Sequence, residues 1–231
     1  MRILAVDTTT KFLSLAIYDN DKVAEYNLET GNRLSSLLIP TIKRTLDVLG
    51  LSPRDIDYFA VGIGPGSFTG IRLGLSAIKG FSFALSKPMI GVPTLDILAM
   101  NASSSDRVIM PAIDAKRGLI YSCAYKYTNG KLAKIMPYSL LTKEEFLRNI
   151  KPLSIIFGDA LNLYRDEIRK HNGDVSFLDK DCWYPKAHNI ITLALNRIKK
   201  GRLGDSFKVD PIYLYPKECQ IRKPAINKKG S

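Results

Sequence analysis

Histidine and cysteine are scarce in this sequence of 231 residues, and their spacing argues against the common metal sites. The only two histidines, His171 and His188, lie 17 residues apart, so they cannot form a helical pair of metal ligands. The three cysteines, Cys123, Cys182 and Cys219, are far apart and show no C-x-x-C spacing. We therefore expect no disulfide framework and no zinc site, which fits a protein of the reducing cytoplasm.

Long hydrophobic runs are also missing. No apolar stretch approaches the roughly 20 residues that a membrane-spanning helix needs. The apolar run that ends at Asp7 is too short for a signal peptide. We therefore expect a protein without a membrane partner.

Acidic residues are too few to balance the basic ones. Lys and Arg number 34 against 22 Asp and Glu, which gives a formal net charge of +12. Such an excess favours a polyanion such as RNA or an acidic protein partner. An even spread of lysine over a solvated surface explains it equally well. The excess is visible late in the chain, in "NRIKKGR" and in the tail "IRKPAINKKGS".

The order of predicted elements repeats once. Residues 2–29 read as three short strands with tight turns, followed by a helix over residues 33–49, a strand, and a helix from about 69 to 85. A polar stretch at residues 103–106 precedes a second set of strands and helices. A duplicated β-β-β-α-β-α unit is the plan of the α/β actin-like ATPase (ASKHA, RNase H-like) fold. We predict subdomains at 1–102 and 103–216, and a basic, flexible tail at 217–231.

The loop "GPGSFTG", residues 64–70, joins a strand to a helix and allows two interpretations. Backbone N–H groups at a helix N-terminus attract phosphate, which makes Gly64, Gly66 and Ser67 candidate nucleotide-proximal residues. The loop is neither a Walker A motif nor a Rossmann fingerprint, and Pro65 has no N–H. A tight turn capped by Ser67 or Thr69 is the favoured alternative.

Each half places an acid near the end of its first strand, Asp7 in the first and Asp114 in the second. Carboxylates at these positions could orient a metal–nucleotide complex in a working ATPase of this fold. The alternatives are that Asp7 closes an Asx or Ser/Thr turn, and that Asp114 pairs with Lys116 and Arg117. We expect no metal site and no catalytic residue.

The helix after the glycine loop is apolar nearly all round, so it must be buried on more than one side. Its small residues include Gly70, Gly74 and Ala77, and they suggest a groove that another backbone could approach. Together with the preceding helix, it forms a candidate interface for a partner or a second copy of the chain. The candidate residues are Leu34, Leu38, Thr41, Ile42, Thr45, Gly70, Gly74, Ala77 and Phe81.

Five stretches of the sequence, taken in order, carry a resemblance to a known family: "MRILAVDTTT", "GIGPGSFTGIRLGLSAIKGFS", "MIGVPTLDILA", "PAIDAKRGLIYSCAY" and "PIYLYPKE". They resemble the TsaB (YeaZ) family of bacterial proteins. The match is strong over residues 1–102 and weaker to about residue 218. Leu34 stands where many relatives have histidine, and Tyr215 replaces the arginine usual in "YLRP".

The resemblance implies a non-catalytic scaffold or activator. Such a subunit supports the threonylcarbamoyltransferase subunit TsaD, which makes N6-threonylcarbamoyladenosine at position 37 of tRNAs reading codons that begin with A. It further implies a TsaE ATPase partner, a homodimer when the chain is isolated, and ATP or ADP only at the junction with the partner. An independent ATPase or peptidase-like enzyme is the alternative. Candidate tRNA-binding residues, inferred from charge, are Lys199, Lys200, Arg202, Arg222 and Lys223.

Overall fold

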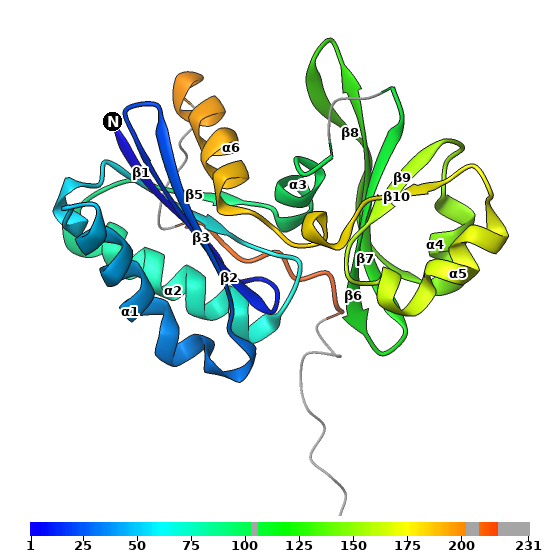
Figure 1. Cartoon of the computed structure of the whole chain (residues 1–231), viewed down its shortest axis with the longest axis horizontal. Coiled ribbons are helices and arrows are strands. Elements are labelled where there is room, and N and C mark those ends of the chain that lie inside the picture. The colour runs from blue at the N-terminus through cyan, green and yellow to red at the C-terminus, as the bar shows by residue number, and fades with distance from the viewer. Residues whose placement is uncertain (103–105, 202–207, 217–231) are drawn as a thin grey trace, which may run out of the picture.

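The computed structural model describes residues 1–102, 106–201 and 208–216. Figure 1 shows two halves side by side, each built on a five-stranded sheet. The candidate residues Arg202, Arg222 and Lys223, the predicted tail at 217–231 and Cys219 lie outside the described residues.

The first sheet has the strand order β3-β2-β1-β4-β5. Its strands are β1 (Arg2–Asp7), β2 (Phe12–Asp19), β3 (Lys22–Glu29), β4 (Tyr58–Gly62) and β5 (Met89–Val92). The first three pair antiparallel, as the sequence predicts, and β4 and β5 then add in parallel. Strands β1 and β4 are buried along nearly their whole length, as expected for strands covered on both faces.

The second sheet repeats this plan in the order β10-β9-β6-β7-β8. Its strands are β6 (Val108–Lys116), β7 (Leu119–Thr128), β8 (Lys131–Thr142), β9 (Ser154–Phe157) and β10 (Ser176–Phe177). Strands β6, β7 and β8 pair antiparallel, and β9 and β10 run parallel to β6. The predicted duplication, and with it the actin-like fold, is confirmed by this repeated topology.

Two helices cover one face of each sheet. In the first half these are α1 (Leu34–Val48) and α2 (Phe68–Leu85), and in the second half α4 (Lys143–Asn149) and α5 (Leu161–His171). Helix α4 begins with a capping box, in which Thr142 and Glu145 exchange hydrogen bonds. The ends of α1 and α2 agree with the sequence-based ranges to within one or two residues.

The remaining two helices are exchanged between the halves. Helix α3 (Thr94–Ala99) follows the first sheet but packs on β6 and β7, whereas α6 (Ala187–Lys199) packs on β1 and β2. The apolar side chains of α6 share a core with Ile3 and Ala5 of β1. The expected boundary at residue 102 therefore separates the two sheets but not the helices that cover them.

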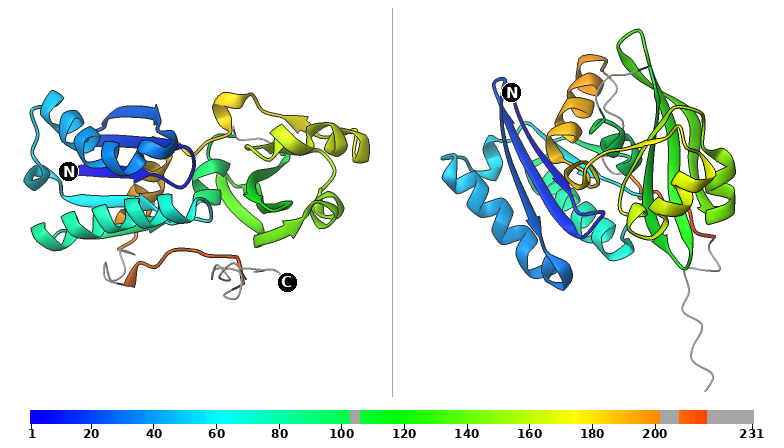
Figure 2. Two further views of the ribbon diagram at one scale, coloured as in Figure 1. Left: turned by 90° about the horizontal axis from the view of Figure 1, so that it is seen from below. Right: turned by 45° about the vertical axis from the view of Figure 1, so that its right-hand side comes forward.

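The segment of residues 208–216 passes back across both halves (Figure 2). The Ile212 N–H donates to the Ile63 carbonyl oxygen at 2.8 Å in the first half. The Tyr215 hydroxyl donates to the Ala115 carbonyl oxygen at 2.8 Å in the second half. The segment is thus hydrogen-bonded to both halves of the molecule.

Candidate functional site

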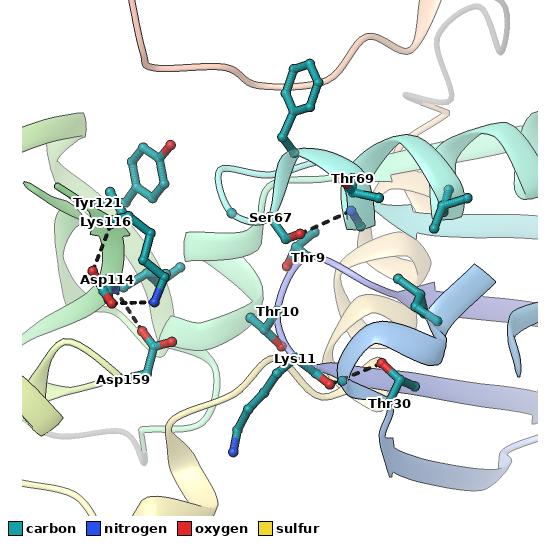
Figure 3. A pocket seen from close by; sticks show the side chains of 18 of the residues that line it. Thr9, Thr10, Lys11, Thr30, Ser67, Thr69, Asp114, Lys116, Tyr121 and Asp159 are labelled. Carbon is teal, nitrogen blue, oxygen red and sulfur yellow. Dashed lines mark hydrogen bonds and ion pairs between the residues drawn. The ribbon is translucent and has the colours of Figure 1, made fainter. Parts of the chain in front are cut away.

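A cleft of about 890 Å³ opens between the two halves. One wall consists of the β1–β2 turn, the start of α1 and the glycine loop, and the other consists of the β6–β7 turn with Asp159 (Figure 3). Of the candidate nucleotide-proximal residues, Gly66, Ser67 and Asp114 line this cleft. The fold therefore brings together two sites that are far apart in the sequence.

The glycine loop is a tight turn whose polar groups are largely satisfied within the chain. The Ser67 N–H donates to the Thr9 carbonyl oxygen at 2.7 Å, and the Ser67 hydroxyl accepts the Gly70 N–H at 3.2 Å. A Cβ at Gly66 would collide with the Thr9 carbonyl oxygen, so only glycine fits there. The interpretation as a turn capped by Ser67 is therefore confirmed. Because the Ser67 and Gly70 N–H groups are used in these bonds, fewer backbone donors remain for a phosphate than the phosphate-binding interpretation of the loop requires.

The prediction that Asp7 and Gly64 lie near a nucleotide is wrong, because neither residue lines the cleft. The Asp7 side chain is buried, at 1% exposed, and accepts hydrogen bonds from the Thr9 N–H at 3.0 Å and the Thr9 hydroxyl at 2.9 Å. This is the Asx turn of the alternative interpretation. Burial raises the pKa of Asp7 to about 6, against the opposing effect of the Thr9 hydrogen bonds. The Gly64 carbonyl oxygen accepts the Thr94 N–H instead.

Asp114 belongs to a small polar cluster on the second wall (Figure 3). Its carboxylate accepts the Lys116 N–H at 2.8 Å and the Lys116 ammonium at 2.6 Å, so the predicted pairing with Lys116 is confirmed. The Asp114 N–H donates to Asp159 at 2.8 Å. Burial raises the pKa of Asp159, and the neighbouring Asp114 carboxylate adds to the rise. The sequence analysis missed Asp159, although its place just after the fourth strand of the second half was a usable signal.

The predicted interface residues of α1 fall into two groups. Leu34, Leu38 and Ile42 lie in the core of the first half, between α1 and the sheet. Their assignment to a partner surface is therefore wrong, because the sheet already covers them. Thr41 and Thr45 are half-buried on the flank of the helix.

The predicted small-residue groove of α2 is filled by the chain itself. The Thr8 hydroxyl donates to the Gly70 carbonyl oxygen at 2.7 Å, and a Cβ at Gly70 or Gly74 would collide with Thr8. The prediction that Gly70 and Gly74 contact a partner is therefore wrong, because Thr8 of the same chain occupies the space beside both. Ala77 is half-buried, and Phe81 stacks on Phe59 with a centroid distance of 5.7 Å.

A different part of the same two helices is open to solvent. We call it the outer helix face and define it by the exposed residues Val48, Ser76, Gly80, Phe83 and Ala84. The exposed fractions of Val48 and Phe83 are 78% and 72%. Around Gly80 no atom lies within 4 Å of an added Cβ. The outer helix face thus exposes two large apolar side chains and has space for further atoms around Gly80.

Other charged and polar residues singled out from the sequence lie at the two ends of α6. Lys199 and Lys200 are exposed at the end of α6. His188, at the start of α6, lies 2.9 Å from a Glu25 carboxylate oxygen. Within residues 1–102, 106–201 and 208–216, no three His, Cys, Asp or Glu side chains cluster as metal ligands. Each helix in those ranges is too short or too polar to cross a bilayer.

Comparisons with known proteins give a consistent picture. The family model "TsaD: tRNA N6-adenosine threonylcarbamoyltransferase" matches residues 29–181. The "tRNA threonylcarbamoyladenosine biosynthesis protein TsaB" of Bacillus subtilis is 31% identical, with 96% of this chain and 97% of that protein covered. The protein of the same name from Escherichia coli is 29% identical over 93% of this chain and 94% of its own length.

Two solved structures are also similar to this chain in fold. One is the structure called "YeaZ from Pseudomonas aeruginosa", with a TM-score of 0.78 at 25% identity, covering 92% of this chain and 100% of that one. A second structure from the same organism, described as similar to "peptidase YEAZ", has a TM-score of 0.81 at 25% identity. It covers 93% of this chain and 99% of that chain.

Proposed function

This chain belongs to the TsaB (YeaZ) family, and on that premise we propose that it takes part in tRNA threonylcarbamoyladenosine biosynthesis as a non-catalytic subunit. Its role is to support a TsaD partner that transfers the threonylcarbamoyl group to adenosine 37 of tRNAs reading codons that begin with A. The names of its relatives support the pathway, and the arrangement of α1 and α2 supports the role.

The outer helix face is the observation that carries this proposal. Val48 and Phe83 are the most exposed of the large apolar side chains in the described residues of the first half, and they lie on two neighbouring helices. Exposed apolar side chains that gather on one surface mark protein–protein contacts. We propose that the TsaD partner binds here, and that an isolated copy pairs with a second copy through the same surface.

The polar groups of the cleft support a structural role better than a catalytic one. The Asp7 side chain is buried, and the carboxylate of Asp114 is paired with Lys116. Neither is placed to hold a metal–nucleotide complex as a working ATPase requires. The groups of the glycine loop fit a nucleotide poorly, so we propose that ATP or ADP binds only at the junction with the partner. A TsaE ATPase in the same assembly and a cytoplasmic location belong to this proposal.

Reconstitution tests the proposal. Purified chain, TsaD partner, tRNA transcript and a threonylcarbamoyl donor should yield threonylcarbamoyladenosine, and leaving out the chain should abolish the product. Replacing Asp114 and Asp159 together by Asn should leave the yield within about twofold of wild type, because neither acts on a reacting atom. A loss of 100-fold or more would favour the independent enzyme.

A further inference from the structure

Helix α5 presents two arginines that are held in place by an aromatic ring. Arg165 and Arg169 lie four residues apart, and so on the same side of the helix. Their guanidinium carbons lie 5.1 and 5.5 Å from the centre of the Phe177 ring. Both side chains are exposed, whereas Phe177 is half-buried beneath them. The ring restrains the guanidinium groups and leaves N–H donors facing water.

Further cations gather at the same end of the second half. Strands β6, β9 and β10 run parallel, so the segments leading into them meet at one edge of the sheet. Arg107 ties two of these segments together, because its guanidinium donates to the carbonyl oxygens of Leu153 and Asp174, both at 2.9 Å. The C-terminal ends of α4 and α5 lie at this edge. They bring the exposed Arg148, Lys151 and Lys170 to it.

We call this surface the arginine face and define it by Arg148, Lys151, Arg165, Arg169 and Lys170. None of the five forms an ion pair with a carboxylate among the described residues. By contrast Lys143, the first residue of α4, binds Glu167 of α5 at 2.8 Å. The acids of these helices and segments are Asp106, Glu144, Glu145, Asp166, Glu167 and Asp174. Glu144 and Glu145 lie in the first turn of α4, away from its C-terminal end, and Glu167 is paired with Lys143, so the five cations outnumber the acids left beside them.

The charge of the whole chain is distributed in the same way. Residues 1–102 carry 10 Lys and Arg against 9 Asp and Glu, whereas residues 103–216 carry 19 against 12. The net positive charge therefore belongs mainly to the second half and the tail. A surface with unpaired cations in a basic half attracts a polyanion from a distance.

We propose that the arginine face binds the phosphate backbone of RNA, with Arg165 and Arg169 as its central contacts. Planar guanidinium groups match phosphate oxygens with two parallel hydrogen bonds, and restraint by Phe177 lowers the entropy lost on binding. That the RNA is tRNA rests on the function proposed above, but the anion-binding surface does not.

The arginine face and the outer helix face lie on different halves of the molecule. Helices α4 and α5 cover the side of the second sheet that points away from the first half, as both views of Figure 2 show. The partner and an RNA can therefore bind at the same time. This arrangement allows the two surfaces to be tested separately.

The test compares two double variants of the full chain in binding to an unmodified tRNA transcript. Arg165→Gln with Arg169→Gln removes two charges from the arginine face. Lys126→Gln with Lys131→Gln removes two from the exposed β7–β8 hairpin as the matched control. At about 0.1 M salt we expect the first to bind about 10-fold more weakly, and its log K against log [salt] slope to fall by about 1–2. The control should bind as wild type.

Equal affinity and salt slope in wild type and the arginine variant would overturn the proposal. So would normal tRNA binding together with lost co-purification of the TsaD partner, because the face would then dock a protein. Circular dichroism melting of both variants checks that the fold is intact, and Arg165→Lys with Arg169→Lys should restore part of the binding. If tRNA binding falls as expected but depletion of the chain leaves threonylcarbamoyladenosine unchanged, the arginine face stands and the proposed function fails.

Discussion

The hydroxyl of Thr8 donates a hydrogen bond to the carbonyl oxygen of Gly70 at 2.7 Å, across a sequence separation of 62 residues. This contact seats the start of α2 directly on the turn after β1. It also explains the glycine at position 74, because a Cβ there would collide with the Thr8 hydroxyl. The small residues of α2 thus serve the interior of the first half, and the partner surface must lie elsewhere on the helix.

Gly74→Ala and Gly80→Ala form a matched pair. Both replacements improve helix propensity by up to about 1 kcal/mol, but only the first forces Thr8 aside. We expect Gly74→Ala to be less stable than Gly80→Ala by about 1–3 kcal/mol, the usual cost of overpacking. Urea unfolding of the two variants measures the difference, and equal midpoints would show that Thr8 moves freely.

Asp7→Asn should change how stability depends on pH. Burial raises the pKa of Asp7 in the folded chain to about 6, so the folded state holds this proton more tightly than the unfolded state. As pH rises from about 4 to 6 the carboxyl group must ionise in the interior, and it destabilises the folded chain by up to about 3 kcal/mol.

The Asn variant lacks this effect, so its stability relative to wild type should rise over that pH window. Unfolding free energies from urea titrations at pH 4 and pH 7 give the comparison. Asp47→Asn, at an exposed position on α1, is the control and should show no such change. A constant difference between Asp7→Asn and wild type across the window would mean that Asp7 is not destabilised by burial.

Asp96→Ala should loosen α3 from the second sheet. One carboxylate oxygen of Asp96 accepts the hydroxyls of both Tyr125 and Tyr138 at 2.7 Å. Removing the acceptor leaves two partly buried phenols unpaired, at a cost of about 2–4 kcal/mol. Asp96→Asn keeps an oxygen at this position and should cost less than half as much. Thermal unfolding ranks the variants, and similar losses in both would assign the effect to charge rather than to the two bonds.

The sequence predicts much of the architecture because its signals are local. Apolar periodicity and turn residues locate β1 to β3, α1 and α2 closely, and the repeat of this order reveals the duplication. The exchange of α3 and α6 could not be predicted, because each helix has an apolar face that fits either sheet. Only the packed structure shows which sheet it covers.

The site was predicted less well, for a similar reason. An all-round apolar helix signals burial on several sides, but the sequence does not say whether a partner or the chain itself provides the cover. At Gly70 and Gly74 the cover is Thr8, which no local pattern indicates. Likewise Asp7 and Asp114 occupy matching places in the two halves, yet only Asp114 lines the cleft, because the Thr9 bonds turn Asp7 inward.

The central claim is that the outer helix face recruits the partner that makes threonylcarbamoyladenosine. The most direct test is mass spectrometry of this nucleoside in tRNA from cells depleted of the chain and complemented with variants. Gly80→Trp with Ala84→Trp fills the exposed side of α2 without touching the core. Lys126→Trp with Lys131→Trp, on the β7–β8 hairpin, adds the same bulk to the second half.

We expect wild type and the hairpin variant to restore the nucleoside fully, and the α2 variant to restore less than a tenth of it while remaining folded and soluble. Full restoration by the α2 variant would contradict the account, because the modification would then proceed with the proposed partner surface blocked.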